Sequence, residues 1–114
     1  MARLVIQRKG KVLKEVSVYK PQFSIGREPH CDVFLQHDSV SRRHAEIQRE
    51  GDEYYIEDHE STNGTLVNRL RIERQRLRDG DVIAIGKFRL RFDRDTVTEA
   101  GVPESGVVEV TGLD

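Results

Sequence analysis

Short apolar stretches, separated by turn-forming residues about every eight to twelve positions, constrain the fold of this chain most strongly. This spacing is typical of a β-sandwich or barrel, and no long stretch has the apolar period of an amphipathic helix. Residues 43–50 are the best candidate for a helix, but Ala45 and Ile47 alternate with polar residues, and the segment ends at Gly51-Asp52. The chain is therefore predicted to be all-β.

Three hairpins are predicted from apolar stretches that flank a tight turn. They join residues 4–6 to 12–18 across Lys9-Gly10-Lys11, residues 45–48 to 54–57 across Gly51-Asp52, and residues 82–85 to 88–92 across Gly86-Lys87. Glycine in the first position of the last turn suits type II′ geometry. In that hairpin the pattern leaves open whether Val82 and Ala84 or Ile83 and Ile85 face the core.

The composition predicts one domain followed by an acidic segment. With 114 residues there is room for a single core, and because aromatic residues make up only 6% with no tryptophan, that core must consist mainly of Val, Ile and Leu. Residues 1–95 are predicted to form the domain, and residues 96–114, interrupted by Gly and Pro, a flexible acidic tail or linker. Residues 99–114 hold four acids and no Lys or Arg, so the net charge of −1 leaves +3 on residues 1–98.

The single cysteine and the hydropathy pattern indicate the compartment. Cys31 has no partner for an intrachain disulfide, which favours a reducing environment, and it is interpreted as a small packed side chain rather than a nucleophile. No apolar run approaches the ~18 residues of a membrane span, and the N-terminus lacks a signal-peptide core. We expect a cytoplasmic protein that does not associate with membranes.

Three predicted loops combine turn-forming residues with hydrogen-bond donors. They are Gly26-Arg27, residues 39–44 (sequence SVSRRH), and residues 60–65 (sequence ESTNGT) followed by Asn68. Loops at one end of a sandwich can converge on one surface patch. Guanidinium groups, hydroxyls, an amide and backbone N–H groups freed by glycine suit a tetrahedral dianion such as phosphate.

These motifs, in this order, resemble the forkhead-associated (FHA) family from Phe23 to Phe92. The matching segments are Gly26-Arg27 and residues 32–35, 38–45, 58–68 and 77–86. The resemblance implies a SMAD/FHA-type β-sandwich of about eleven strands, with ligand-binding loops at one end. It also implies a non-enzymatic module that binds a phosphothreonine-containing protein in a Ser/Thr protein kinase pathway, without a cofactor.

The resemblance also assigns roles by position. Arg27 and Ser41 match the phosphate-binding arginine and serine, and Arg42 falls where a polar or basic residue often faces phosphate or peptide backbone. Thr62 matches the threonine that contacts phosphate and the phosphothreonine methyl group, and Asn63 the residue that braces loops and contacts peptide. Structural support of the binding loops is expected from Gly26, His44, Gly64 and Asn68. Arg69 departs from the pattern, because glycine is common after the asparagine, which affects the expected turn geometry and any peptide contact of Asn68.

Other functions are less well supported by the residues. A Ser41–His44 nucleophile–base pair lacks an orienting carboxylate and a nucleophile elbow. The histidines and Cys31 match no recurring zinc spacing, so no metal is predicted. The arginine-rich residues 69–78 lack aromatic stacking partners, so we interpret them as a solvated face rather than a nucleic-acid site, although they could attract acidic residues near a phosphothreonine.

Two further possibilities are kept open. A phospho-independent interaction or scaffold module of the same fold is the alternative function. Within the tail, Thr111 is followed three residues later by Asp114, so phosphorylated Thr111 is a candidate for self-recognition by the binding loops.

Overall fold

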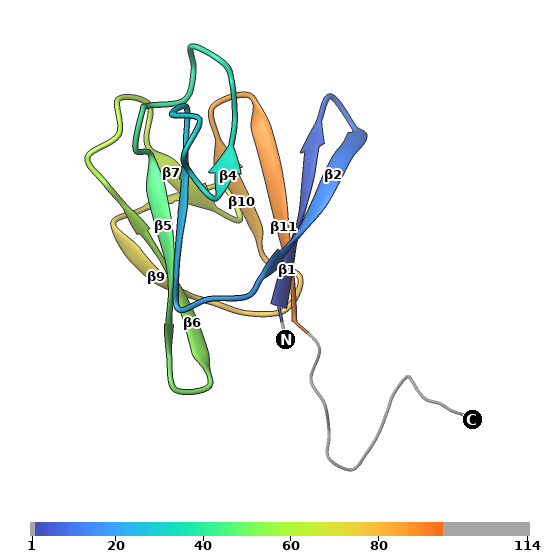
Figure 1. Cartoon of the computed structure of the whole chain (residues 1–114), viewed down its shortest axis with the longest axis vertical. Helices are drawn as coiled ribbons and strands as arrows, with labels where there is room; N and C mark the ends of the chain where they lie inside the picture. The colour runs from blue at the N-terminus through green and yellow to red at the C-terminus, as the bar shows by residue number, and fades with distance from the viewer. Residues whose placement is uncertain (1, 95–114) are drawn as a thin grey trace.

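A computed structural model describes residues 2–94, which form eleven strands in two sheets and contain no helix (Figure 1). The first sheet has the order β2 (Lys11–Val18), β1 (Ala2–Arg8), β11 (Phe88–Arg94), β10 (Val82–Ile85), β7 (Thr65–Val67) and β8 (Leu70–Ile72). The second has the order β4 (Val33–Phe34), β3 (Gln22–Gly26), β5 (Ala45–Glu50), β6 (Glu53–Asp58) and β9 (Arg74–Leu77). The predicted all-β sandwich of about eleven strands is confirmed.

The core consists of the inward-facing residues of both sheets. Strands of both sheets alternate between buried and more exposed side chains, as the two-residue period of a half-buried strand requires. Ile83 and Ile85 are fully buried while Val82 and Ala84 face outward, which settles the question that the sequence left open. Aromatic contacts join the sheets, since the rings of Tyr54 and Phe92 lie 5.4 Å apart.

The three predicted hairpins are present, and their turns are short. Gly86 has a φ of 57° and Lys87 does not share a positive φ, which agrees with a type II′ turn between β10 and β11. The turn between β7 and β8 is different, because Asn68 and Arg69 have φ values of 50° and 74°. Two consecutive positive φ values define a type I′ turn, in which glycine is preferred at the position of Arg69.

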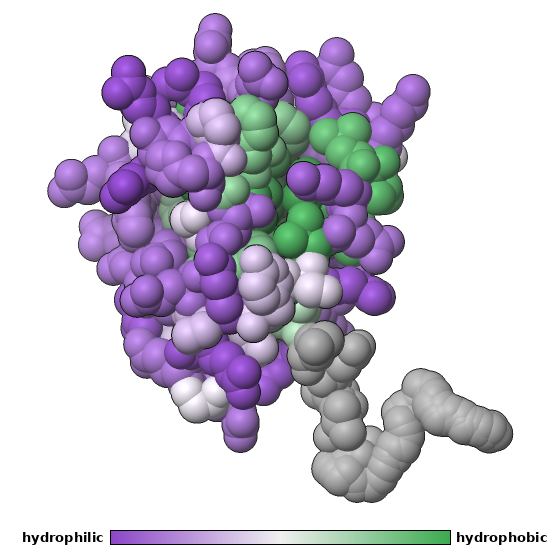
Figure 2. Space-filling model, in the orientation of Figure 1, coloured by the Kyte–Doolittle hydropathy of each residue, from purple (hydrophilic) through white to green (hydrophobic). Residues whose placement is uncertain are grey.

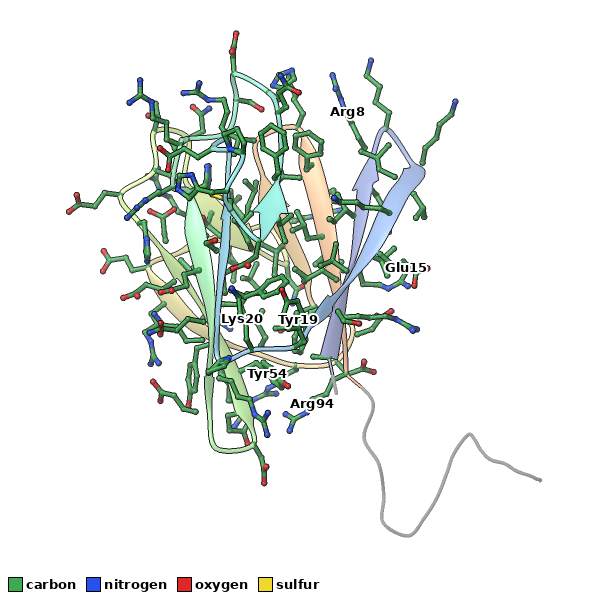
Figure 3. All side chains as sticks on the ribbon, in the orientation of Figure 1. Arg8, Glu15, Tyr19, Lys20, Tyr54 and Arg94 are labelled. Atoms are coloured by element: carbon green, nitrogen blue, oxygen red, sulfur yellow. The ribbon has the colours of Figure 1, made fainter. Side chains whose placement is uncertain are left out.

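The connections gather at the two ends of the sandwich. The segments β3–β4, β4–β5, β6–β7 and β10–β11 approach one end, here called the loop end, and the β5–β6 hairpin points the opposite way (Figure 1). Arg8, beside the β1–β2 turn, lies at the loop end, whereas Tyr54 and Arg94 lie toward the opposite end (Figure 3). All three candidate binding segments therefore lie at the same end.

The surface is mostly hydrophilic, with one apolar area visible over β2 and between β4 and β11 (Figure 2). Val12 and Leu13 on β2 are more than half exposed. Among residues 2–94, no helix is long and apolar enough to span a membrane.

Candidate functional site

The position of Arg27 depends on the absence of a side chain at Gly26. A Cβ at Gly26 would lie 2.1 Å from the carbonyl oxygen of Arg42, so only glycine lets these two segments approach so closely. The Arg27 backbone N–H donates to the carbonyl of Ser41 at 3.0 Å, and its Nε donates to the carbonyl of Val40 at 2.9 Å. These bonds orient an exposed guanidinium and leave its two terminal nitrogens without a bond to residues 2–94.

Ser41 and Thr62 connect the second loop to the third. The Thr62 backbone N–H donates to Ser41 Oγ at 2.9 Å, so the hydroxyl oxygen is already used as an acceptor. The Ser41 hydroxyl hydrogen is then available as a donor to a ligand. Ser41 is half-buried and Thr62 is exposed, so both hydroxyl groups border solvent at the loop end.

His44 is fully buried and connects the same two loops from beneath. The Ser41 backbone N–H donates to Nδ1 at 3.0 Å, and Nε2 lies 2.8 Å from the Gly64 carbonyl oxygen. Because Nδ1 accepts a hydrogen bond, the proton must be on Nε2, which donates to Gly64. Burial lowers the pKa of His44, although the bond to Gly64 and the charge of Asp58 oppose the shift. A neutral imidazole is thus a brace between the loops.

Asp58, the last residue of β6, holds the third loop through hydrogen bonds to its side chain. Its Oδ1 accepts the hydroxyl groups of Ser61 at 2.5 Å and Thr65 at 2.7 Å, and its Oδ2 accepts the Ser61 backbone N–H. Burial alone would raise the pKa of Asp58, but these hydrogen bonds outweigh burial and lower it. Ser61 Oγ in turn accepts the N–H of Gly64, whose φ is 86°. The Asp58 carboxylate is therefore occupied by the protein's own donors.

Asn63 and Ser39 connect the binding loops to the β10–β11 turn. Asn63 Nδ2 donates to the Ser39 carbonyl at 2.9 Å, and the Lys87 backbone N–H donates to Ser39 Oγ at 3.0 Å. A Cβ at Gly86 would lie 2.3 Å from Ser39 Oγ, so glycine is required for this contact. Asn63 is therefore held by a hydrogen bond that joins the third loop to the second.

Arg42 adds an exposed positive charge beside Arg27. No ion pair within residues 2–94 involves Arg42, whereas its neighbour Arg43 lies 3.5 Å from a carboxylate oxygen of Glu28. The three binding loops thus carry the guanidinium groups of Arg27 and Arg42 and the hydroxyl groups of Ser41 and Thr62, while Asp58 accepts hydrogen bonds from Ser61 and Thr65. Arginine forks and hydroxyl donors are the groups that proteins use to bind phosphate.

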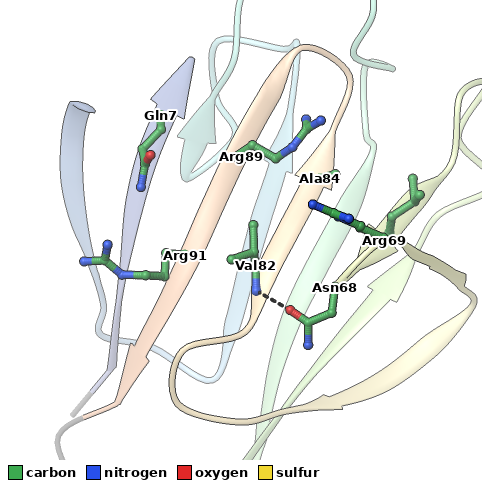
Figure 4. A pocket seen from close by; sticks show the side chains of 8 residues that line it. Gln7, Asn68, Arg69, Val82, Ala84, Arg89 and Arg91 are labelled. Atoms are coloured by element: carbon green, nitrogen blue, oxygen red, sulfur yellow. Dashed lines mark hydrogen bonds between the residues drawn. The ribbon is translucent and has the colours of Figure 1, made fainter. Parts of the chain in front are cut away.

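Asn68 lies outside this network. Its Nδ2 donates to Asp81 Oδ1 at 2.9 Å, and its Oδ1 accepts the Val82 N–H at 3.0 Å (Figure 4). It follows Val67, at the end of β7 away from Gly64, so it supports the β7–β8 turn. The structure brings together the other predicted residues but places Asn68 apart from them.

Several contacts of the site were not expected from the sequence. The Val40 carbonyl orients Arg27, and Ser39 carries the contact to the β10–β11 turn. Asp58 was not among the predicted site residues, although an aspartate three residues before Ser61 is a pattern that signals such side-chain bonding. Backbone carbonyl roles have no sequence signal at all.

The residues weighed for other chemistry are used structurally. Burial raises the pKa of the Cys31 thiol, and its Sγ lies 3.6 Å from the Arg42 carbonyl oxygen, as fits a packed side chain. In the described part of the chain, Glu46, Glu57 and His59 are close enough to share a metal ion. The Gln48 amide nitrogen already donates to both carboxylates, at 3.1 and 2.7 Å, which occupies oxygen atoms that a metal would need.

The fold and site together define a β-sandwich whose loop end carries arginine and hydroxyl donors. The FHA domain family model matches residues 23–86, which spans all three binding segments. The chain belongs to the FHA family.

Two relatives and two solved structures illustrate the similarity. The glycogen accumulation regulator GarA of Mycolicibacterium smegmatis is 44% identical over 91 residues, which cover 80% of this chain and 58% of that protein. The oxoglutarate dehydrogenase inhibitor of Corynebacterium jeikeium is also 44% identical over 91 residues, which cover 80% of this chain and 63% of that protein. The matched part of the chain thus spans about three fifths of the length of these relatives.

The solved structures concern phosphopeptide recognition. An FHA domain studied for phosphothreonine-dependent interactions is 29% identical with a TM-score of 0.76, covering 85% of this chain and 100% of that one. EmbR of Mycobacterium tuberculosis, in complex with a low-affinity phosphopeptide, is 33% identical with a TM-score of 0.74, covering 81% of this chain and 24% of that one.

Proposed function

We propose that this protein is a phosphothreonine-dependent interaction module that binds a phosphorylated partner in a Ser/Thr kinase pathway and catalyses no reaction. The observation that carries the proposal is that hydrogen bonds hold together, at one end of the sandwich, the loops that carry Arg27, Ser41 and Thr62, with His44 joining the second loop to the third. The residue roles taken from the family resemblance fit this geometry. The relatives' names, a regulator and an inhibitor, are consistent with a protein that acts by binding.

Each donor has a distinct part in the proposed complex. Arg27 offers its terminal nitrogens to two phosphate oxygens, and Arg42 contributes a second positive charge. The Ser41 hydroxyl hydrogen remains available for a phosphate oxygen, because its oxygen is occupied by Thr62 N–H. Thr62 borders the position of the phosphothreonine methyl group, and Asn63 the peptide backbone. Gly26, His44 and Gly64 position these donors without contacting ligand.

A phospho-independent scaffold of the same fold is the second candidate. The exposed Val12 and Leu13 on the edge strand β2 favour it, since a partner can pair with an open apolar edge. A scaffold that ignores phosphate has no use for Arg27 or for a free hydroxyl donor at Ser41. The phosphothreonine-binding proposal therefore explains more of the site.

Two related expectations remain proposals. A buried free thiol at Cys31 fits the reducing, cytoplasmic compartment that we propose. Thr111 lies outside the described part of the chain, and self-recognition through phosphorylated Thr111 is a second proposal that depends on the same binding loops.

The proposed function can be tested with a phosphothreonine peptide library and its unphosphorylated counterpart. The best phosphopeptide should then be titrated into the parent, Arg27→Ala, Ser41→Ala and the control Arg49→Ala, which changes an exposed arginine next to the β5–β6 turn, at the end opposite the loop end. Hydrogen bonds to charged groups contribute about 1.5–3 kcal/mol, so Arg27→Ala should weaken binding roughly 10- to 100-fold or more. Equal binding by the parent and Arg27→Ala, or no preference for phosphorylated peptides, would contradict the proposal.

A further inference from the structure

A groove on the outer face of the six-stranded sheet combines an apolar floor with basic rims. Leu66, Val82 and Ala84 form the floor, and the rims are Arg89 and Arg91 on β11 and Arg69 in the β7–β8 turn (Figure 4). The register explains this layout, because Arg91 lies opposite Val82 and Arg89 opposite Ala84, which in turn lies opposite Leu66. Apolar side chains on β10 and β7 thus lie between long, charged ones.

The rims carry positive charge that the described residues only partly neutralise. Arg91 is paired with Asp93, at 2.9 and 3.0 Å. Arg89 donates to the Phe88 carbonyl at 3.2 Å, and within residues 2–94 neither Arg89 nor Arg69 has an acidic partner. Two guanidinium groups beside an apolar floor favour an acidic occupant that also carries apolar side chains.

Arg69 adds an independent reason to expect an occupant. Its φ of 74° is one that glycine adopts at lower cost, so an arginine here destabilises its own turn. Strained residues that persist in a structure are often held for function. The side chain that accompanies this strain is the guanidinium on the groove's rim.

The sequence after β11 has the required chemistry. Residues 1–94 hold all 19 Lys and Arg and 15 of the 20 acids, whereas residues 95–114 hold the other five acids and no Lys or Arg. That segment also contains the apolar residues Val107, Val108 and Val110. It begins one residue after Arg94, at the end of the strand that carries Arg89 and Arg91. An extended chain advances about 3.3 Å per residue, so Glu99 and all later acids can reach the groove.

We propose that residues 95–114 bind back onto this groove of the same chain, with their acids at Arg69 and Arg89 and the valines of residues 107–110 over Leu66, Val82 and Ala84. This site differs from the phosphothreonine-binding loops, since it needs no phosphate and uses none of Arg27, Ser41 or Thr62. A short tether gives an effective concentration on the order of millimolar, so even weak contacts populate the bound state.

The proposal can be tested in the full chain by NMR. A nitroxide label is attached at Ser105→Cys in a Cys31→Ala background, and the broadening of backbone amide signals is compared between the groove and the outer face of the second sheet. Broadening at Leu66, Val82 and Ala84 is expected to exceed that at Glu46 and Gln48. It should fall at least about threefold near 1 M salt, where the Debye length is about 3 Å.

Two groove variants and one control separate docking from chance proximity. Arg69→Gly should reduce the broadening at the groove and raise the unfolding temperature, because glycine adopts the positive φ of this turn at lower cost. If Arg69 had only a structural role in the turn, the substitution would change the unfolding temperature and leave the broadening unchanged. Arg89→Gln should lower the broadening with little change in stability, and the control Arg76→Gln should leave it unchanged. The proposal would be overturned if the broadening at the groove were unchanged in both Arg69→Gly and Arg89→Gln, or if the broadening were equal on the two sheets. Broadening that rises with protein concentration would also overturn it, since a second copy would then be the occupant.

Discussion

Replacing the buried His44 with alanine should destabilise the fold and disable the binding loops together. The substitution leaves the Ser41 N–H and the Gly64 carbonyl without their partners. An unsatisfied buried polar group costs about 1–3 kcal/mol, so the two together should cost about 2–6 kcal/mol. That is a large share of the roughly 5–15 kcal/mol typical of a domain. Because the chain has no tryptophan, unfolding in urea is best followed by far-UV circular dichroism.

Ser41→Ala is the matched comparison, because it removes one hydroxyl group from the same network. Its loss of the bond from Thr62 N–H should cost only about 0.5–1.5 kcal/mol of stability, while phosphopeptide binding falls at least tenfold. His44→Ala, by contrast, should lose both stability and binding. A stability loss below about 1 kcal/mol for His44→Ala would refute the reasoning, since it would show that the imidazole does not hold the two loops.

Three further changes have directions that follow from the structure. Gly26→Ala should cost about 1–3 kcal/mol and weaken phosphopeptide binding, because its Cβ would displace the Arg42 carbonyl; urea unfolding and calorimetric titration measure the two effects. Arg69→Gly should raise the free energy of unfolding by about 1 kcal/mol, and a decrease would contradict the reading of the β7–β8 turn. Stability should also fall as the pH drops below about 6.5, since burial lowers the pKa of folded His44 and the unfolded chain then binds more protons. In urea titrations at pH 7 and 5.5, this decrease should be smaller in His44→Ala.

Local pattern was sufficient to predict the strands of three hairpins, whereas the short strands β4, β7, β8 and β9 were not predicted individually. Alternation around Ala45 and Ile47 indicated a strand against the helical alternative, and Gly86 indicated the tight turn before β11. The sequence pattern alone did not show whether Val82 or Ile83 points into the core, because both residues are apolar. The second sheet decides it by packing against Ile83 and Ile85.

The binding site was predictable only as far as side-chain types and family position allow. Arg27, Ser41 and Thr62 carry donor chemistry that is visible in the sequence. Asn68 was grouped with the binding loops because it follows the third motif closely, but β7 carries it away from them to Asp81. Contacts made by backbone atoms, such as the Val40 carbonyl that orients Arg27, depend on how loops distant in sequence approach each other and have no residue signature.

The central claim is most directly tested with one peptide prepared in three forms, carrying threonine, phosphoserine or phosphothreonine, and titrated calorimetrically into the full chain. The account predicts binding of the phosphothreonine form, no measurable binding of the threonine form, and at least about fourfold weaker binding of the phosphoserine form, since one buried methyl group contributes about 0.8 kcal/mol. Equal affinity for the threonine and phosphothreonine forms would contradict the account.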